Sequence, residues 1–291
     1  MTRLKASDVE HIPVSLSGYE AELRSRTGRG LKGLACNAVG VEKQEMDGVL
    51  PRVRARVVPL TWGEGLIPGF AAAVSAVLNW IGLAASTTRN ANLAGIEEAV
   101  QEKCELVFFS DDDDFLVWHL DRRRTVHNAM ATGKGFAAGL DLMAGGVRQR
   151  RALVMGCGAV GASAALELNR RGARVTLYDR MPERCDHLKA GMVRTGPGDV
   201  LIAENLEASL REVDCIIDAT PAADLIDADR IGPDTLVSAP GMPLGLTDAA
   251  VKKIGRRLLH DPLQIGVATM AVQALAEMPL RIHRPENLRT R

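Results

Sequence analysis

Short apolar runs and longer segments of helical spacing alternate along the second half of the chain. The predicted strands lie at 153–155, 174–178, 215–217, 235–238 and 257–260. The predicted helices lie at 162–171, 181–190, 206–213, 224–231, 246–254 and 265–278. Thr247 or Asp248 can cap the fifth of these helices. Strands that alternate with helices in this way predict a doubly wound parallel sheet.

The first half is less regular, but it alternates too. Strands are expected at 54–60, 106–109 and 115–120, and helices at 67–81, 93–102 and 128–145. Ser7 and Glu10 form an S-x-x-E pattern that predicts a capping box at the start of an N-terminal helix. Pro13 should keep that helix short or break it. Alanine and glycine in 128–145 indicate a long helix that bridges the two halves and packs closely.

A phosphate-binding pattern begins the second half. The glycines Gly156, Gly158 and Gly161 follow the apolar run 153–155 in a G-x-G-x-x-G arrangement. The first glycine permits a tight turn, the second lets the backbone approach a pyrophosphate, and the third lets the next helix pack close to the strand. Backbone N–H groups of Ala159 and Val160 would face the phosphates at the helix N-terminus. The alternative is a glycine-rich turn without a ligand.

The end of the next predicted strand bears on the choice of nucleotide. Asp179 follows Gly161 by 18 residues, which is close to the spacing of an acidic residue that holds ribose hydroxyls. Its carboxylate would repel a 2′-phosphate, so the sequence favours NAD over NADP as the cofactor. The neighbouring Arg180 favours NADP instead, because a guanidinium group can bind a 2′-phosphate. The fold class predicted is therefore α/β with two domains: a C-terminal Rossmann domain at 148–291 and an N-terminal α/β domain at 1–147 that includes the bridging helix.

Three further segments follow predicted strands of the second half. They are "DATPAAD", "SAPGMPLG" and "HDPLQIG". Because ligands bind outside the carboxyl ends of parallel strands, Thr220, Pro221, Pro240 and Gly241 are expected beside the cofactor. The alternative for each segment is ordinary turn chemistry, since proline and glycine are common in any loop.

Composition excludes several classes of protein. Among 291 residues, Lys+Arg and Asp+Glu both number 36, which argues against a broad nucleic-acid surface. We see no apolar run long enough to span a bilayer and no secretory signal. The five cysteines are scattered, as expected for reduced thiols in the cytoplasm. The six histidines are scattered as well, so no metal site is predicted.

Two segments of the first half are candidate substrate loops. "VPLTWGEGLIPGF" contains Gly63 and Gly65, which indicate a tight turn into a helix, and "FFSDDDDF" places four carboxylates at a strand end. One carboxylate of the run 111–114 can face the cleft and bind an ammonium group. The alternative is a solvated turn.

Taken together, these segments resemble the pyrrolysine synthase family over nearly the whole chain, from Leu4 to about Leu275. The pieces that carry the resemblance are "VPLTWGEGLI", "SDDDDFLVWHL", "HNAMATG", "ATP", "APGMP" and "DPLQIGVATM", in that order. The chain departs from the family in a basic linker near 52–56 and in a tail beyond Pro279.

The resemblance implies a specific reaction. Such enzymes use NAD to oxidise the terminal amine of 3-methylornithyl-lysine, after which the α-amine attacks and ammonia leaves to form the pyrroline ring of pyrrolysine. It implies substrate contacts at Leu4, Asp111, Asn128 and Asp261, with Leu4 and its neighbours closing over the substrate as a lid. It also implies a homodimer. No catalytic residue is assigned, because no histidine or lysine is an obvious base.

Each implied substrate residue has a plainer alternative. Leu4 can belong to a frayed terminus, Asp111 to a solvated turn and Asp261 to a turn before proline, while Asn128 can be a helix N-cap. Two other functions also stay open. One is a relative of shikimate or amino-acid dehydrogenases with another small substrate, and the other is a non-catalytic NAD-sensing protein.

Overall fold

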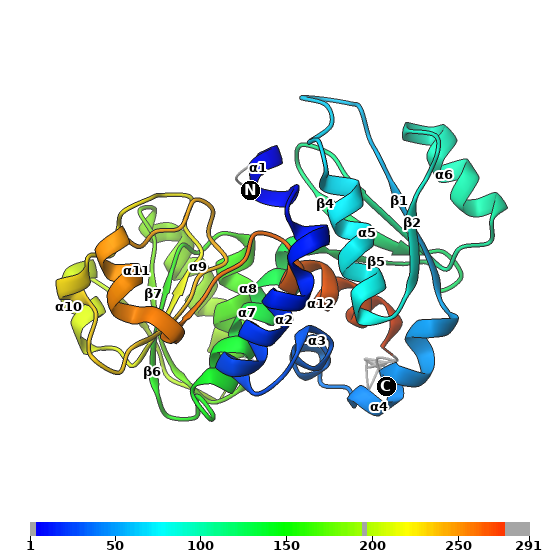
Figure 1. Cartoon of the computed structure of the whole chain (residues 1–291). Helices are drawn as coiled ribbons and strands as arrows, with labels where there is room; N and C mark the ends of the chain where they lie inside the picture. The colour runs from blue at the N-terminus through cyan, green and yellow to red at the C-terminus, as the bar shows by residue number, and fades with distance from the viewer. Residues whose placement is uncertain (1–3, 194–196, 277–291) are drawn as a thin grey trace, which may run out of the picture.

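The computed structural model describes residues 4–193 and 197–276, and each half of the chain builds one sheet (Figure 1). The strands of the first sheet are β1 (Arg54–Val58), β2 (Ala84–Thr87), β3 (Leu106–Ser110), β4 (Phe115–His119) and β5 (Arg124–His127). Their order is β2-β1-β3-β4-β5, with β1, β2 and β3 parallel and β4 and β5 antiparallel to their neighbours. β1 includes most of the basic segment expected to be a linker at 52–56, so that expectation is wrong.

The second sheet is entirely parallel among the described residues. Its strands are β6 (Arg151–Met155), β7 (Arg174–Tyr178), β8 (Val200–Ile202), β9 (Cys215–Asp218), β10 (Leu236–Ser238) and β11 (Leu258–Leu259). Their order is β11-β10-β9-β6-β7-β8. The order reverses beside β6, which is where such sheets bind ligands. The predicted doubly wound α/β fold is confirmed.

Helices cover both sheets. In the first half they are α1 (Ala6–Val9), α2 (Ile12–Thr27), α3 (Leu31–Val39), α4 (Lys43–Val49), α5 (Phe70–Ile81), α6 (Asn92–Gln101) and α7 (Asn128–Met143). In the second half they are α8 (Ala159–Arg170), α9 (Pro182–Met192), α10 (Leu206–Glu212), α11 (Asp248–Ile254) and α12 (Gln264–Leu275). No helix in these described parts is long and apolar enough to cross a membrane.

The bridging helix α7 packs tightly between the two halves, as its composition predicts. A Cβ atom at Gly133 would collide with the Val160 carbonyl oxygen on α8 and would come within 2.7 Å of the Ser163 Cβ. The Ser163 hydroxyl donates to the Met130 carbonyl oxygen of α7 at 2.6 Å. Only glycine permits this approach, so the two helices position the nucleotide turn relative to the first sheet.

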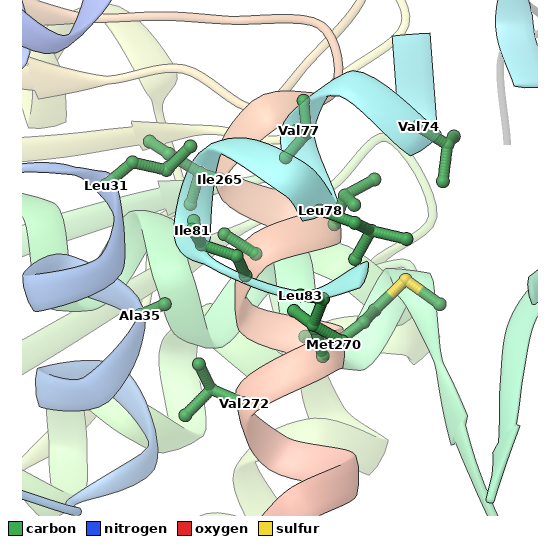
Figure 2. Packing of buried hydrophobic residues seen from close by; sticks show 14 of the residues in the cluster. Leu31, Ala35, Val74, Val77, Leu78, Ile81, Leu83, Ile265, Met270 and Val272 are labelled. Carbon is green, nitrogen blue, oxygen red and sulfur yellow. The ribbon is translucent and has the colours of Figure 1, made fainter. Parts of the chain in front are cut away.

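The last helix returns to the first half. Figure 2 shows Ile265, Met270 and Val272 of α12 packed among side chains of α3 and α5, including Leu31 and Leu78. All of these side chains are fully or almost fully buried. Replacing such a leucine with alanine typically costs about 2–5 kcal/mol of stability. α12, which comes from the second half of the sequence, therefore packs in the core of the first half. The predicted domain boundary after residue 147 stays a prediction.

The N-terminal capping signal lies elsewhere than predicted. α1 begins at Ala6 with Lys5 as its N-cap, and the Lys5 main-chain N–H donates to the Asp8 carboxylate at 2.7 Å. Ser7 is therefore inside the helix and does not cap it. The predicted break near Pro13 is present, because α1 ends at Val9. Pro13 then occupies the first turn of α2, where no intrahelical hydrogen bond is lost.

One predicted helix is wrong. Residues 224–231 hold only a short 3-10 helix, Ala228–Arg230. Ile226 instead pairs with the chain near Leu246: its N–H donates to the Gly245 carbonyl oxygen at 2.9 Å, and its own carbonyl accepts from the Thr247 N–H at 3.2 Å. These bonds occupy backbone groups that a helix needs. The predicted end of the last helix at 278 and the tail lie outside the described residues.

Candidate functional site

A cavity of about 780 Å³ lies between the two halves, and loops from both sheets line it. Most of the residues predicted for cofactor and substrate are on its wall: Leu4, Asp111, Asn128, Gly156, Gly158, Ala159, Val160, Asp179, Thr220, Pro221, Pro240, Gly241 and Asp261. Gly161 and Arg180 are not among the lining residues. Gly161 is buried beneath the turn, and Arg180 is exposed to solvent.

The three glycines of the turn have separate physical roles. Gly156 has a φ of +84°, and its N–H donates to the Tyr178 carbonyl oxygen at 2.8 Å. A Cβ atom at Gly161 would collide with the Gly156 carbonyl oxygen, so this glycine lets α8 begin close to β6. A Cβ atom at Gly158 would meet nothing within 4 Å and would project into open space at the cavity wall. This open space is where the sequence predicts that a pyrophosphate approaches the backbone.

Asp179 fixes the edge of this turn. Its Oδ2 accepts from the Cys157 N–H at 2.7 Å, and its Oδ1 accepts from the Met181 N–H at 2.9 Å. An ionised carboxylate has about four acceptor positions, so two stay available to ribose hydroxyls. Arg184 of α9, which no sequence motif indicates, also lines the cavity.

Asp218 is a structural residue of the site that no local sequence pattern indicates. It is fully buried at the end of β9. Its Oδ1 accepts from the Thr220 N–H at 3.1 Å and from the Thr220 hydroxyl at 2.7 Å, and its Oδ2 accepts from the Gly245 N–H at 3.1 Å. Burial raises its pKa, and these hydrogen bonds oppose that rise. Asp218 thus holds two cofactor-side loops together.

This wall fits a dinucleotide. The first backbone N–H groups of α8 have no acceptor within the helix, and the helix begins beside the open space at Gly158, which suits phosphate oxygens. Asp179 suits a ribose with free hydroxyls. Thr220, Pro221, Pro240 and Gly241 continue the same wall toward the first half, so a nicotinamide ring would face the loops of the first sheet.

Asp111 lies at the end of β3 in a tight turn. Its Oδ1 accepts from the main-chain N–H groups of Asp113 at 2.9 Å and Asp114 at 2.8 Å. The residue is exposed and lines the cavity. The turn geometry is that of the solvated turn given above as the alternative for Asp111. Its position at the cavity wall also leaves the carboxylate open to a ligand.

Asn128 is the first residue of α7, and His127 is the N-cap, so Asn128 does not cap the helix. Its side chain is buried, accepts from the Thr132 hydroxyl at 3.2 Å and donates to the Met270 sulfur at 3.2 Å. The thioether is a weak acceptor. The amide therefore has hydrogen-bonding capacity left for a polar ligand in the cavity.

Asp261 is buried and follows β11. Its Oδ2 accepts from the Tyr19 hydroxyl of α2 at 2.7 Å, and its Oδ1 accepts from the N–H groups of Leu263 at 3.0 Å and Ile265 at 3.3 Å. Burial raises its pKa, while the hydrogen bond from Tyr19 and the Ile265 N–H work against that rise. Nothing in the local sequence around Tyr19 indicates this contact.

Apolar side chains also line the cavity. Leu4 is half-buried against the core of the first half and lines the cavity. Trp62 and Leu66 belong to the loop between β1 and α5, line the same space and are each 51% exposed. The Glu64 N–H donates to the Asp112 carboxylate at 2.9 Å, which ties this loop to the acidic turn.

The cysteines give no sign of metal binding. Cys157 and Cys185 lie 3.5 Å apart between sulfur atoms beneath the glycine turn, where burial raises the pKa of both thiols. All five cysteines are free and buried. Within residues 4–193 and 197–276, no group of three or more His, Cys, Asp or Glu side chains is arranged to hold a metal ion.

Solved structures share the architecture at low sequence identity. A quinate dehydrogenase from Corynebacterium glutamicum in complex with NAD matches with a TM-score of 0.53 and 16% identity, over 76% of this chain and 92% of that one. A shikimate dehydrogenase from Aquifex aeolicus matches with a TM-score of 0.54 and 17% identity, over 78% and 95%. These likenesses show the fold.

Sequence comparisons are more specific. Residues 8–126 match the family described as pyrrolysine biosynthesis protein PylD, N-terminal domain, and residues 125–230 match the alanine dehydrogenase/PNT C-terminal domain. The pyrrolysine synthase of Methanosarcina acetivorans is 28% identical over 94% of this chain and 100% of its own length. That of Methanosarcina barkeri is 27% identical over 94% and 98%. These matches confirm the resemblance to the pyrrolysine synthase family that the sequence predicts.

Proposed function

We propose that this chain is an NAD-dependent dehydrogenase that oxidises the terminal amine of 3-methylornithyl-lysine and allows the product to cyclise to pyrrolysine. The observation that carries the proposal is the cavity of about 780 Å³, which the glycine turn lines together with the carboxylates of Asp111 and Asp261 and the amide of Asn128. The choice of substrate rests on the relatives named pyrrolysine synthase, which this chain matches over almost their full length.

The nucleotide is held by the second half. Gly156, Gly158, Ala159, Val160 and Gly161 form the pyrophosphate cradle at the start of α8, and Asp179 binds the ribose. When bound there, the nicotinamide ring supplies a hydride acceptor. The protein contributes position and electrostatics. Arg180 is a proposed contact at the rim of the adenosine site, where it is exposed to solvent.

The first half recognises the substrate. The molecule has ammonium groups at both ends, a carboxylate and a central amide, so its site needs carboxylates and a neutral amide. Asp111 and Asp261 are the proposed ammonium partners, and Asn128 is the proposed partner of the amide or carboxylate. Leu4 packs over this part of the cavity and excludes water from the reactive imine.

Ring closure follows oxidation. Loss of hydride from the carbon that bears the terminal amine gives an imine, and the α-amine attacks that carbon. Ammonia then leaves, and the five-membered pyrroline ring stays. A cavity that holds the two amines close together favours this step through proximity.

Two further properties belong to the proposal. We propose that the protein works in the cytoplasm, since its five cysteines are free thiols. We also propose a homodimer, as the family resemblance implies. Light scattering at micromolar concentration measures the assembly directly, and a monomer mass contradicts that part of the proposal.

The direct test is an assay with purified protein, NAD⁺ and 3-methylornithyl-lysine. NADH absorbance should rise, and it should stay flat with shikimate or free ornithine. Turnover of shikimate would support a relative of shikimate dehydrogenases instead. Tight NADH binding without turnover of any amine would support a sensing protein.

A further inference from the structure

Asp261 borders a second cavity as well as the first. This second cavity has a volume of about 350 Å³, and Asp261 and Pro262 line both spaces. The rest of its wall comes from α2, including Tyr19 and Glu22, and from His260 and Gln264. Asp261 and Pro262 therefore separate the proposed substrate site from a pocket beneath α2.

The carboxylate has one acceptor position left after its internal hydrogen bonds. Tyr19 donates to Oδ2, and the N–H groups of Leu263 and Ile265 donate to Oδ1. These three donors use three of about four acceptor positions of an ionised carboxylate. The remaining lone pair is on Oδ2, the oxygen that Tyr19 contacts.

The helix that carries Tyr19 is attached to β11. Two helical turns further along α2, the Arg26 guanidinium donates to the Leu258 carbonyl oxygen of β11 at 2.5 Å. The same guanidinium pairs with Glu22. These contacts fix α2 along the end of β11, so the Tyr19 hydroxyl stays beside Asp261. Burial raises the pKa of Tyr19, and the negative charge of Asp261 adds to that rise.

We infer that Asp261 accepts the proton of the substrate's terminal ammonium group, and that Tyr19 positions this carboxylate and passes the proton toward the second cavity. The inference rests on the proposed function. One N–H bond of the ammonium breaks, its electron pair stays on nitrogen, and an O–H bond forms on Asp261. The neutral amine is then able to lose a hydride from the adjacent carbon.

The carboxylate must next be restored. The Tyr19 oxygen accepts the proton from Asp261 while its own hydroxyl proton goes to water in the second cavity. The net result is one proton released to solvent for each amine deprotonated. Tyr19 is unchanged at the end, so no other reactant is needed.

Electrostatics in the cavity favour this transfer. A buried carboxylate with a raised pKa is a better base than an exposed one, and desolvation lowers the pKa of an ammonium group. The two pKa values therefore approach each other. Other titratable or charged groups face Asp261 or Tyr19 from the surrounding elements: His11, Glu20, Glu22, Arg26 and His260 on the side of α2, and Asp111 with its acidic neighbours, Asp179 and Arg184 around the main cavity.

The variant Tyr19→Phe tests the inference. It removes a hydrogen bond that lowers the pKa of Asp261, so that pKa should rise further. The acid limb of the pH profile of kcat/KM should move upward by roughly one pH unit, because the base is protonated at a higher pH. Tyr178→Phe is the matched control: Tyr178 is the chain's other tyrosine, and its hydroxyl has no hydrogen bond within the described part of the chain.

A second measurement needs neither cofactor nor turnover. Infrared difference spectra recorded during a pH titration should show the carboxyl band of protonated Asp261, identified by its disappearance in Asp261→Asn. Its midpoint should be higher in Tyr19→Phe than in wild type. Asp261→Asn keeps an oxygen that accepts from the Leu263 and Ile265 N–H groups, and it should lower turnover by about a hundredfold or more.

The outcomes separate the two proposals. If wild type turns over the substrate and Tyr19→Phe lowers activity equally at every pH with an unchanged infrared midpoint, the proton path is wrong and the proposed function stands. If wild type shows no turnover of the amine, both fail. A shifted acid limb and a shifted midpoint together support the inference.

Discussion

The Asp179 carboxylate accepts a hydrogen bond from the Cys157 main-chain N–H, with 2.7 Å between Oδ2 and nitrogen. This bond ties the end of β7 to the middle of the glycine turn. It places a negative charge at the cavity wall where the ribose of a dinucleotide would lie. Choice of nucleotide and shape of the turn therefore depend on the same side chain.

Cofactor preference follows from that charge. NAD⁺ should bind at least about tenfold more tightly than NADP⁺, because the 2′-phosphate would lie beside a carboxylate. Asp179→Ala should reduce the difference to about threefold or less, as measured by calorimetric titration of both nucleotides. A wild-type preference for NADP⁺ would show that this interpretation of Asp179 is wrong.

The variant Asp179→Asn separates the effect of the negative charge from that of the hydrogen bond to the Cys157 N–H. Asparagine keeps one oxygen that accepts from the Cys157 N–H, but it carries no charge. We expect NAD⁺ affinity close to wild type and improved NADP⁺ affinity. If NAD⁺ affinity falls as far in this variant as in Asp179→Ala, the negative charge, and not the hydrogen bond to Cys157, is what binds the ribose.

The second prediction concerns Gly158. Its φ is −71°, and a Cβ atom there meets nothing within 4 Å, so Gly158→Val should fold normally. The valine side chain would occupy the pyrophosphate space and should weaken NAD⁺ binding at least a hundredfold, about 2.7 kcal/mol. Gly48→Val of α4, which is exposed and has equally open surroundings, is the control and should bind normally. Retained binding in Gly158→Val would refute the assignment of the cradle.

The nucleotide turn was predictable because its signals are local. A buried strand, three glycines and a helix lie within residues 151–170. Gly156 and Gly161 each have a steric reason visible in the structure, whereas the space beside Gly158 is open. The alternation of strands and helices in the second half has the same local origin. The same alternation predicts a helix at 224–231, and this prediction is wrong. There the backbone of Ile226 forms hydrogen bonds to residues 245 and 247 instead of bonds within a helix.

Contacts between distant segments were not predictable from one sequence. Tyr19 and Asp261 are 242 positions apart, and neither local pattern points to the other. Helix α3 was also missed. Six of its nine residues are buried and it contains a glycine, so it lacks the two-sided pattern that reveals an amphipathic helix. Asp218 escaped notice because its role depends on Gly245, which comes from another loop.

The third prediction addresses the N-terminal segment. Leu4 packs on the core of the first half and lines the cavity, so Leu4→Ala should admit water and lower kcat/KM roughly tenfold. NAD⁺ affinity should not change. Val14→Ala is the matched control, since Val14 is 86% exposed and does not line the cavity. Unchanged turnover in Leu4→Ala would remove the lid from this account.

The fourth prediction concerns Asp111. In Asp111→Asn the side-chain oxygen can still accept from the N–H groups of Asp113 and Asp114, so the turn should persist while the charge is lost. A charge-assisted hydrogen bond to an ammonium contributes about 1.5–3 kcal/mol, and kcat/KM should therefore fall about ten- to a hundredfold.

Melting temperature and NAD⁺ affinity distinguish binding from folding in that variant. Both should match wild type, as they should in the control Asp121→Asn, an exposed turn residue that does not line the cavity. Loss of stability and of nucleotide binding together would mean that Asp111 supports the fold and that the ammonium binds elsewhere.

The most direct measurement uses substrate labelled with ¹⁵N at the terminal amine of the ornithine part. The protein is mixed with NAD⁺ and this substrate, NADH is followed by absorbance, and the products are analysed by mass spectrometry. We predict one NADH for each pyrroline product, with the label released as ammonia and the ring nitrogen unlabelled. NADH formation without the ring product, a ring that retains the label, or no reaction at all would contradict the proposed oxidation and cyclisation.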